Sequence, residues 1–195
     1  MAGPTPEAPR SPRPSKHVAP EGLYETAQHY VGDLVYGAND GVLTTFAVVA
    51  GVTGGALPAT AVVVVGMANL VADGLSMGVG NDLGIRARKS ALERQGRPEE
   101  ESQPARHGVA TFLAFAAAGF VPLFPYLVPG AGDEFTPAAC LAFTTLFGVG
   151  AARSLVTASR WWVSGLEMLG LGILVAIAAY ATGAGVARLI QNGAG

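Results

Sequence analysis

The sequence has little charge and few residues that supply nucleophilic or soft-metal chemistry. Only 13% of its residues are charged, and it has one cysteine and three histidines. Cys140 alone cannot form an intrachain disulfide or a cysteine-based zinc site, and its apolar neighbours predict a small buried side chain. The histidines, His17, His29 and His107, share no helical spacing, and no metalloprotease, phosphate-loop or serine-hydrolase motif is present. We therefore expect no enzyme, and the net charge of −2 gives no indication of nucleic-acid binding.

Hydrophobic residues, in contrast, are abundant. They make up 50% of the 195 residues, and the mean hydropathy is +0.40, which is unusual for a soluble domain of this length. A membrane-spanning helix needs about 20 mostly apolar residues. Five segments meet this requirement, at about 34–54, 59–83, 108–128, 137–157 and 163–187. The predicted fold class is an all-α, polytopic integral membrane protein, with a five-helix membrane domain over 31–190 in the lipid bilayer.

The charged residues predict how the chain crosses the membrane. Residues 1–20 lack the apolar core of a signal peptide, and we expect a disordered or partly helical cytoplasmic tail over residues 1–30. The charged connection 84–107 is predicted to be an aqueous loop whose first half continues the second helix. With the amino terminus in the cytoplasm, eleven of the twelve Lys and Arg residues lie on the inner side, and only Arg188 lies outside. The carboxyl terminus is then outside.

Two of the predicted helices carry polar stripes. In the first helix, Asp33, Gly37, Asp40 and Thr44 recur at positions that share one face. In the second helix, four polar or sulfur-containing residues follow at steps of four: Asn69, Asp73, Met77 and Asn81. These two faces are predicted to contact something other than lipid.

The carboxylates inside the predicted spans need a common explanation. A carboxylate in hydrocarbon costs at least about 2.5–3.5 kcal/mol, and it usually lines an ion path or a water-filled cavity. Asp40, Asp73 and Glu167 all lie within predicted spans. Oxygen ligands alone suit magnesium or calcium, whereas the Met77 thioether shifts the preference toward softer ions such as ferrous iron. The predicted metal-binding residues are Asp33, Asp40, Asp73, Met77, Asn81 and Glu167.

Most of the acidic residues in and beside these spans, and Met77, also have a structural alternative. Met77 can fill a gap in the packing, and Asp40 can make an interhelical hydrogen bond. Asp33 and Asp82 can be solvated helix ends. Glu167 can pair with Arg153 or Arg160 near the inner surface.

Glycines accompany both stripes and suggest close helix contacts. Gly37 to Gly41 and Gly74 to Gly78 are each Gly-x-x-x-Gly, a spacing that lets membrane helices, or two protomers, approach closely. One protomer's Asp40 and Met77 cannot fill a coordination shell of four to six ligands. A homodimer, in which a symmetry-related copy supplies the remaining ligands, is therefore expected.

Four segments together resemble a known family. DLVYGANDGVLTTFAVVAG (33–51) and ANLVADGLSMGVGN (68–81) are similar to the first two helices of the vacuolar iron transporter family, and RHGVATFLAF (106–115) and WVSGLEML (162–169) to its third and fifth helices. The resemblance implies a five-helix homodimer that moves ferrous iron, and sometimes manganese, out of the cytosol in exchange for protons, through a path at the dimer interface. It implies that Asp40 and Met77 bind the metal within the membrane and that Asp33 lies at the cytoplasmic mouth.

The sequence departs from the family's eukaryotic iron transporters in one place. Those proteins insert a glutamate-rich metal-binding domain between the second and third helices, where this chain has only residues 84–107. It therefore resembles a bacterial-type member, and its excess of Arg over Lys is typical of a GC-rich bacterial genome, which predicts the cell membrane as its location. The alternative function is a non-transporting membrane protein whose polar dimer interface is structural or senses metal. No cofactor is expected, because the metal ion is cargo.

Overall fold

The computed structural model describes residues 23–96, 103–128, 132–155 and 159–193, which are almost entirely helical. Within these ranges the order is α1 (Leu23–Gly54), α2 (Ala59–Arg94), α3 (Pro104–Phe120), the short 3-10 helix η1 (Val121–Leu127), α4 (Phe135–Arg153) and α5 (Trp161–Gly193). Five helical segments in this part of the chain, with α3 and η1 forming one of them, are long and apolar enough to cross a membrane. The protein is thus a multi-pass integral membrane protein with an all-helical fold, as the hydropathy predicted.

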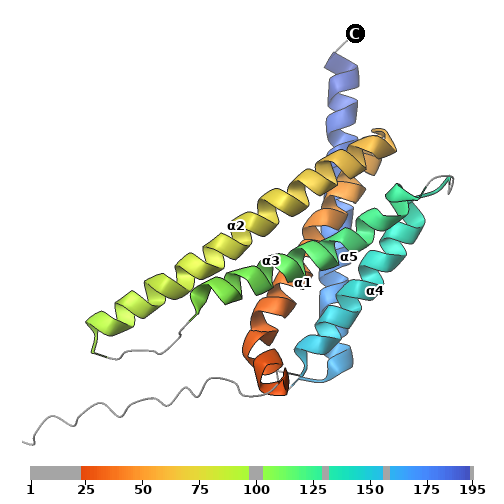
Figure 1. The fold of residues 1–195 in the computed structure, drawn as a ribbon. Helices are drawn as coiled ribbons and strands as arrows, with labels where there is room; N and C mark the ends of the chain where they lie inside the picture. The colour runs from red at the N-terminus through yellow and green to blue at the C-terminus, as the bar shows by residue number, and fades with distance from the viewer. Residues whose placement is uncertain (1–22, 97–102, 129–131, 156–158, 194–195) are drawn as a thin grey trace, which may run out of the picture.

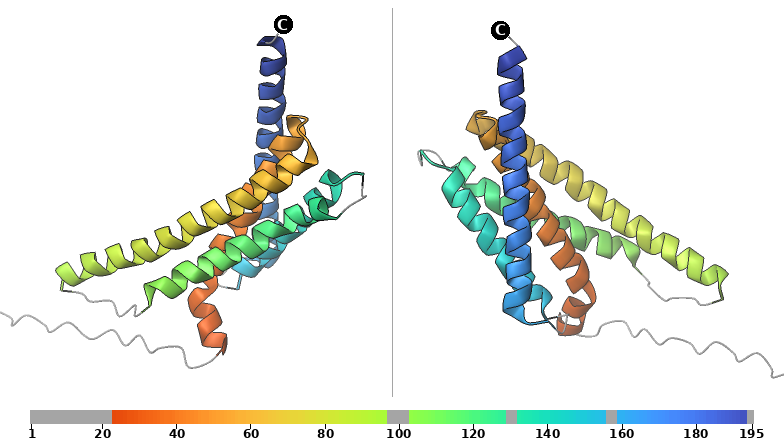
Figure 2. Two further views of the ribbon diagram at one scale, coloured as in Figure 1. Left: turned by 45° about the horizontal axis from the view of Figure 1, so that its top comes forward. Right: turned by 180° about the vertical axis from the view of Figure 1, so that it is seen from behind.

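Helix α1 lies at the centre of the arrangement. It contacts α2, α3, α4 and α5, while α3 also packs along α2 and α4 along α5. Figures 1 and 2 show α2 and α3 side by side and oblique to α4 and α5, with α1 between the two pairs. The first residues of α1 and the last residues of α5 lie at opposite ends of the protein (Figure 1). This is the arrangement required of a chain that crosses a membrane an odd number of times.

An aromatic and aliphatic core holds α1 against its neighbours. Phe46 is 2% exposed, and its ring lies 5.2 Å from that of Phe143 and 6.2 Å from that of Phe135. Phe115 from α3 and Leu123 from η1 are fully buried in the same cluster. Many large apolar side chains lie instead on the outer surface, and in the most apolar stretch of α5 only 6% of the residues are buried. Lipid is the environment that such an exterior needs.

The ends of α2 and α3 lie where the charged connection and the prolines of the sequence predicted a change. Helix α2 continues to Arg94, and its 36 residues span roughly 54 Å at 1.5 Å per residue, so its end extends beyond a hydrocarbon layer about 30 Å thick. The third span was predicted over 108–128 with a kink at its prolines, and within it the α-helix ends at Phe120 and continues as η1. Pro122 and Pro125 lack the backbone N–H that an α-helix requires, which explains the change.

The glycines of both Gly-x-x-x-Gly motifs face α3 of the same chain. A Cβ atom at Gly37 would lie 2.5 Å from the Thr111 carbonyl oxygen, and one at Gly78 would lie 2.7 Å from the Gly108 carbonyl oxygen. Gly41 and Gly74 are likewise buried against α3 side chains or backbone. Of the two contacts that the spacing allowed, the structure therefore assigns these glycines to helix packing within one protomer.

One prediction from composition is wrong, and another lies outside the described residues. Cys140 was expected to be buried, but it is exposed, because it lies on the part of α4 opposite the buried Ala138 and Ala142. The tail predicted over residues 1–30 falls mostly outside the described part of the chain, which begins with α1 at Leu23.

Candidate functional site

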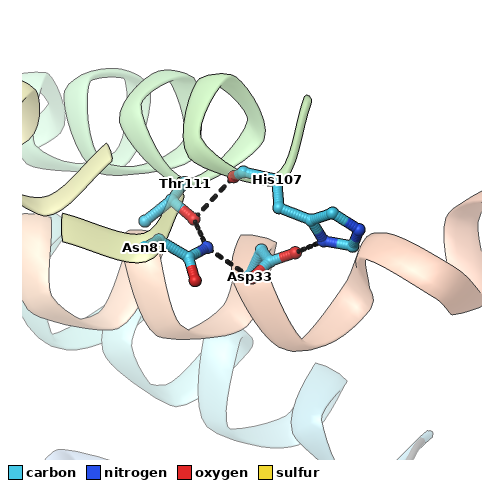
Figure 3. Close-up of polar contacts among 4 residues, drawn as sticks. All are labelled: Asp33, Asn81, His107 and Thr111. Carbon is cyan, nitrogen blue, oxygen red and sulfur yellow. Dashed lines mark hydrogen bonds and ion pairs between the residues drawn. The ribbon is translucent and has the colours of Figure 1, made fainter. Parts of the chain in front are cut away.

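A polar network joins α1, α2 and α3 at the end of the bundle where α1 begins. The Asn81 amide donates hydrogen bonds to Asp33 Oδ1 at 2.7 Å and to Thr111 Oγ1 at 2.8 Å. The other carboxylate oxygen of Asp33, Oδ2, lies 2.5 Å from His107 Nδ1 (Figure 3). One residue of the first polar stripe and one of the second therefore meet two residues of the third helix.

The network is well shielded but not sealed. Thr111 is fully buried and His107 is 7% exposed, while the Asp33 side chain is 19% exposed. The Thr111 hydroxyl donates in turn to the His107 carbonyl oxygen at 2.9 Å, and the Tyr30 ring lies 4.7 Å from the His107 ring. These contacts hold the Asp33 carboxylate and the His107 imidazole in fixed positions. Asp33 is therefore a partnered side chain, in contrast to the solvated helix end that the sequence also allowed.

The second group of candidate residues lies further along the same helices. The carboxylates of Asp40 on α1 and Asp73 on α2 lie close enough for their charges to interact. Met77, one turn from Asp73, is partly buried and packs against the hydrophobic core. Packing of this kind is compatible with both roles considered for Met77, because its sulfur can ligate while its carbons fill space.

The α2 stripe follows the border of that helix's buried face. Leu70, Gly74 and Gly78 are buried against the protomer, and Asn69, Asp73, Met77 and Asn81 lie beside this buried row and are half-buried. Half-buried polar side chains within a membrane-spanning helix need a further polar surface, because lipid offers no hydrogen-bonding partner.

Several buried polar atoms in the spans lack hydrogen-bonding partners among the described residues. They include Asn39 Oδ1 and Thr45 Oγ1 on α1 and Asn69 Nδ2 and Asp82 Oδ1 on α2. The Thr44 and Thr53 hydroxyls, by contrast, donate to the carbonyl oxygens of Asp40 and Val49, at 2.8 and 2.7 Å. An unsatisfied buried polar group costs about 1–3 kcal/mol, so water is favoured beside these atoms, and a passing cation is favoured beside the oxygens among them.

The predicted ligand Glu167 and Asp82, an acidic residue considered as a helix end, both lie beside basic side chains. Glu167 Oε2 lies 3.9 Å from Arg153 Nη1, and the Glu167 side chain is 58% exposed, which matches the alternative pairing predicted for it. Asp82 Oδ2 lies 2.9 Å from Arg86 Nε, one helical turn away. Neither residue belongs to the network of Figure 3.

Sequence reasoning missed two members of this network, Thr111 and His107. From the sequence, His107 was interpreted as an interfacial residue, because it directly precedes the third predicted span. The available signal was its spacing to Thr111, since residues four apart share a helix face. A histidine and a hydroxyl on one face, next to glycines that admit close contact, predict a polar interhelical contact.

No group of three or more His, Cys, Asp or Glu side chains able to hold a metal occurs within the described ranges. A metal ion bound by one protomer in this part of the chain would therefore use amide, thioether or water ligands beside its carboxylates. Alternatively, a second copy of the chain would supply further carboxylates.

Comparison with known proteins places these residues in a family context. The sequence profile of the VIT family matches residues 31–103 and 84–184. A protein named vacuolar iron transporter from Toxoplasma gondii is 41% identical over 75 residues, which is 38% of this chain but only 25% of the Toxoplasma protein. Rice vacuolar iron transporter 2 is 23% identical over 225 residues, covering 86% of this chain and 90% of the rice protein.

Rice vacuolar iron transporter 1 shows similar coverage. It is 22% identical over 236 residues, covering 91% of this chain and 92% of the rice protein. Both rice alignments are longer than this 195-residue chain, so each contains several tens of rice residues that have no counterpart here.

Proposed function

The chain belongs to the VIT family, and from this membership together with the polar residues of α1 and α2 we propose that it transports a divalent metal ion. The cargo is ferrous iron or manganese, carried out of the cytosol in exchange for protons. The observation that carries this proposal is the pair of interacting carboxylates, Asp40 and Asp73, inside two membrane-spanning helices. Charged groups at such depth are costly and line ion paths.

The chemistry of the two carboxylates supports exchange of metal for protons. Adjacent negative charges repel each other, and either a divalent cation or protons relieve this repulsion. Metal and protons then compete for the same carboxylate oxygens, which is what an antiporter needs. Met77, one turn from Asp73 on α2, adds a thioether and biases the choice toward ferrous iron over magnesium.

The unsatisfied polar atoms supply the rest of the route. Asp33 and Asn81 stand at the cytoplasmic mouth, and Asn39, Thr45 and Asn69 offer hydrogen-bonding atoms along the spans. An ion that moves from the mouth past Asp40 and Asp73 meets oxygen atoms of Asn39 and Thr45 on α1, while Asn69 Nδ2 on α2 can donate a hydrogen bond to a water that accompanies the ion. Glu167, beside Arg153, stays a candidate for a separate role in ion binding.

A homodimer with the path between its protomers fits the incomplete ligand set. The half-buried stripe of α2 needs a polar cover, and a second copy provides one along a two-fold axis. Two copies of Asp40, Asp73 and Met77 meeting at that axis supply four carboxylates and two thioethers. These are enough to complete a shell of four to six ligands.

The orientation follows from the basic residues. The inner ends of α2 and α4 carry Arg86, Arg88, Lys89, Arg94 and Arg153, which supports an inner, cytoplasmic amino terminus and an outer carboxyl terminus. For a bacterial chain the membrane is the cell membrane.

Flux into proteoliposomes tests the function directly. Purified protein is reconstituted, and the uptake of ferrous iron, manganese, cobalt and zinc is followed with and without an imposed proton gradient. We expect ferrous iron flux that accelerates with the gradient and a matching movement of protons. Binding of metal without any flux would instead support the non-transporting, metal-sensing alternative.

A further inference from the structure

His107 is the one histidine whose side chain the structure places in the polar network, and the proposed path does not use it. Its Nδ1 atom lies 2.5 Å from Asp33 Oδ2 (Figure 3). We infer that His107 is a metal ligand, and that Asp33 and His107 together form a first binding site for the transported ion at the cytoplasmic mouth. This inference rests on the proposed function, because it identifies where the cargo first binds.

The distance between the two atoms is close to what a shared metal needs. Two ligand atoms each about 2.1 Å from one metal ion lie about 3.0–3.4 Å apart, depending on coordination geometry. An opening of less than about 1 Å from the present 2.5 Å therefore admits an ion between Nδ1 and Oδ2. The 19% exposure of the Asp33 side chain leaves a way in from the cytoplasmic side.

The surrounding contacts resemble those that support metal ligands. The Asn81 amide holds Asp33 Oδ1 at 2.7 Å, and Thr111 links Asn81 to the backbone of His107. The Tyr30 ring packs beside the imidazole. Hydrogen bonds and packing of this kind orient metal-binding side chains before the ion arrives.

A nitrogen ligand at this position has a consequence for selectivity. Imidazole suits ferrous iron and other transition metals, whereas magnesium prefers oxygen ligands and keeps its waters. A mouth built from Asp33 alone would attract any divalent cation by its charge. With His107 it favours transition metals over magnesium at the first contact, in a chain with only residues 95–103 between α2 and α3.

The test of this inference detects a histidine nitrogen bound directly to the metal ion. The parent protein for this experiment is purified, tag-free protein in which His17 and His29 are replaced by Gln. The probe is Mn²⁺, added up to two equivalents per chain. Pulsed electron paramagnetic resonance then detects any nitrogen bound to the ion. We expect coupling to a coordinated imidazole nitrogen. We also expect this coupling to vanish in the additional variant His107→Gln, which keeps an amide able to donate a hydrogen bond to Asp33.

Two further measurements separate ligation from a purely structural role. Labelling the histidines of the parent protein with ¹⁵N changes the coupling pattern without altering His107, so the test survives if the Gln variant does not fold. Loss of the ligand should weaken Mn²⁺ binding at the mouth by at least about tenfold and make Mg²⁺ a better competitor.

The inference is overturned if the parent protein shows no nitrogen coupling, or if the coupling persists in His107→Gln. Weaker binding in the variant without nitrogen coupling in the parent would make His107 a positioning residue for Asp33, which also overturns the inference. Flux through the parent protein is measured separately. Flux without nitrogen coupling would support the transport function and contradict the His107 site. Nitrogen coupling without flux would support the His107 site and contradict the transport function.

Discussion

Replacing Gly78 by Ala should separate α2 from α3 and open the polar network at the mouth. A Cβ atom at Gly78 would lie 2.7 Å from the Gly108 carbonyl oxygen and 3.2 Å from Phe112 Cβ, whereas ordinary contacts begin at 3.4 Å. The Gly108 oxygen belongs to the backbone, so the helices must part by about 0.7 Å to restore an ordinary contact. Gly108 adjoins His107, so the displacement occurs beside the network.

The size of the effect follows from two opposing terms. Overpacking a tight contact costs about 1–3 kcal/mol, whereas exchanging Gly for Ala inside a helix gains about 1 kcal/mol. Gly80→Ala is the matched control, because Gly80 lies on the same helix and a methyl group there would meet no neighbouring side chain or helix within 4 Å. The gain is common to both variants. The free energy of unfolding of Gly78→Ala should therefore be about 1–3 kcal/mol below that of Gly80→Ala.

The functional consequence comes from the hydrogen bond that Asn81 makes to Thr111. Its length is 2.8 Å, and an opening of about 0.7 Å takes it beyond the usual range of about 2.7–3.2 Å. Reversible unfolding in mixed micelles measures the free energy of unfolding. Ferrous iron flux in liposomes reports whether the polar network at the mouth still supports transport. Equal stability and equal flux for Gly78→Ala and Gly80→Ala would refute the close packing of α2 on α3.

Three other changes have distinct expected outcomes. Met77→Leu preserves the side-chain volume, so the free energy of unfolding should change by less than about 1.5 kcal/mol. Ferrous iron and cobalt flux should fall more than manganese flux, and equal losses for all metals would assign Met77 to packing. Thr111→Val removes the buried acceptor of Asn81 and should lower the free energy of unfolding by about 1–3 kcal/mol, as measured by denaturant titration; an unchanged value would mean that water replaces the hydroxyl. Hydrogen bonds from the Thr136 side chain and backbone lower the pKa of Asp133 below its ordinary value of 3.8, so the stability they add at the start of α4 is present above that pH and lost as pH falls through the lowered value. The protection factors of the amides there, corrected for the intrinsic exchange rate, should fall at low pH in the wild type and not in Asp133→Asn, and identical pH profiles would contradict this.

The membrane character and helix order could be predicted from the sequence because they depend on local properties. Apolar runs of sufficient length determine the spans, and Pro122 and Pro125 marked the place where the third helix changes to η1. The periodic stripe from Asn69 to Asn81 likewise predicted which face of α2 is polar. Each inference needed only the residues of one segment.

Contacts between helices could not be predicted in the same way. The Gly-x-x-x-Gly spacing shows that something approaches Gly37 and Gly78 closely, but the partner, α3, depends on the packing of the whole bundle. His107 was missed for the same reason, since its partner Asp33 is 74 residues away in the chain. Glu167 is intermediate, because Arg153 was one of two partners predicted for it and the structure selects that one.

The proposal that the half-buried carboxylates of the spans carry the ion is tested most directly by the flux of Asp40→Asn. The substitution keeps the size of the side chain and removes its charge. Asp133→Asn is the matched control, because the exposed Asp133 lies in the connection before α4, and Asn accepts the hydrogen bond of a helix start as well as Asp does. With equal amounts of folded protein in liposomes under a proton gradient, we expect no ferrous iron flux through Asp40→Asn and the wild-type rate through Asp133→Asn. Wild-type flux through Asp40→Asn would contradict the account.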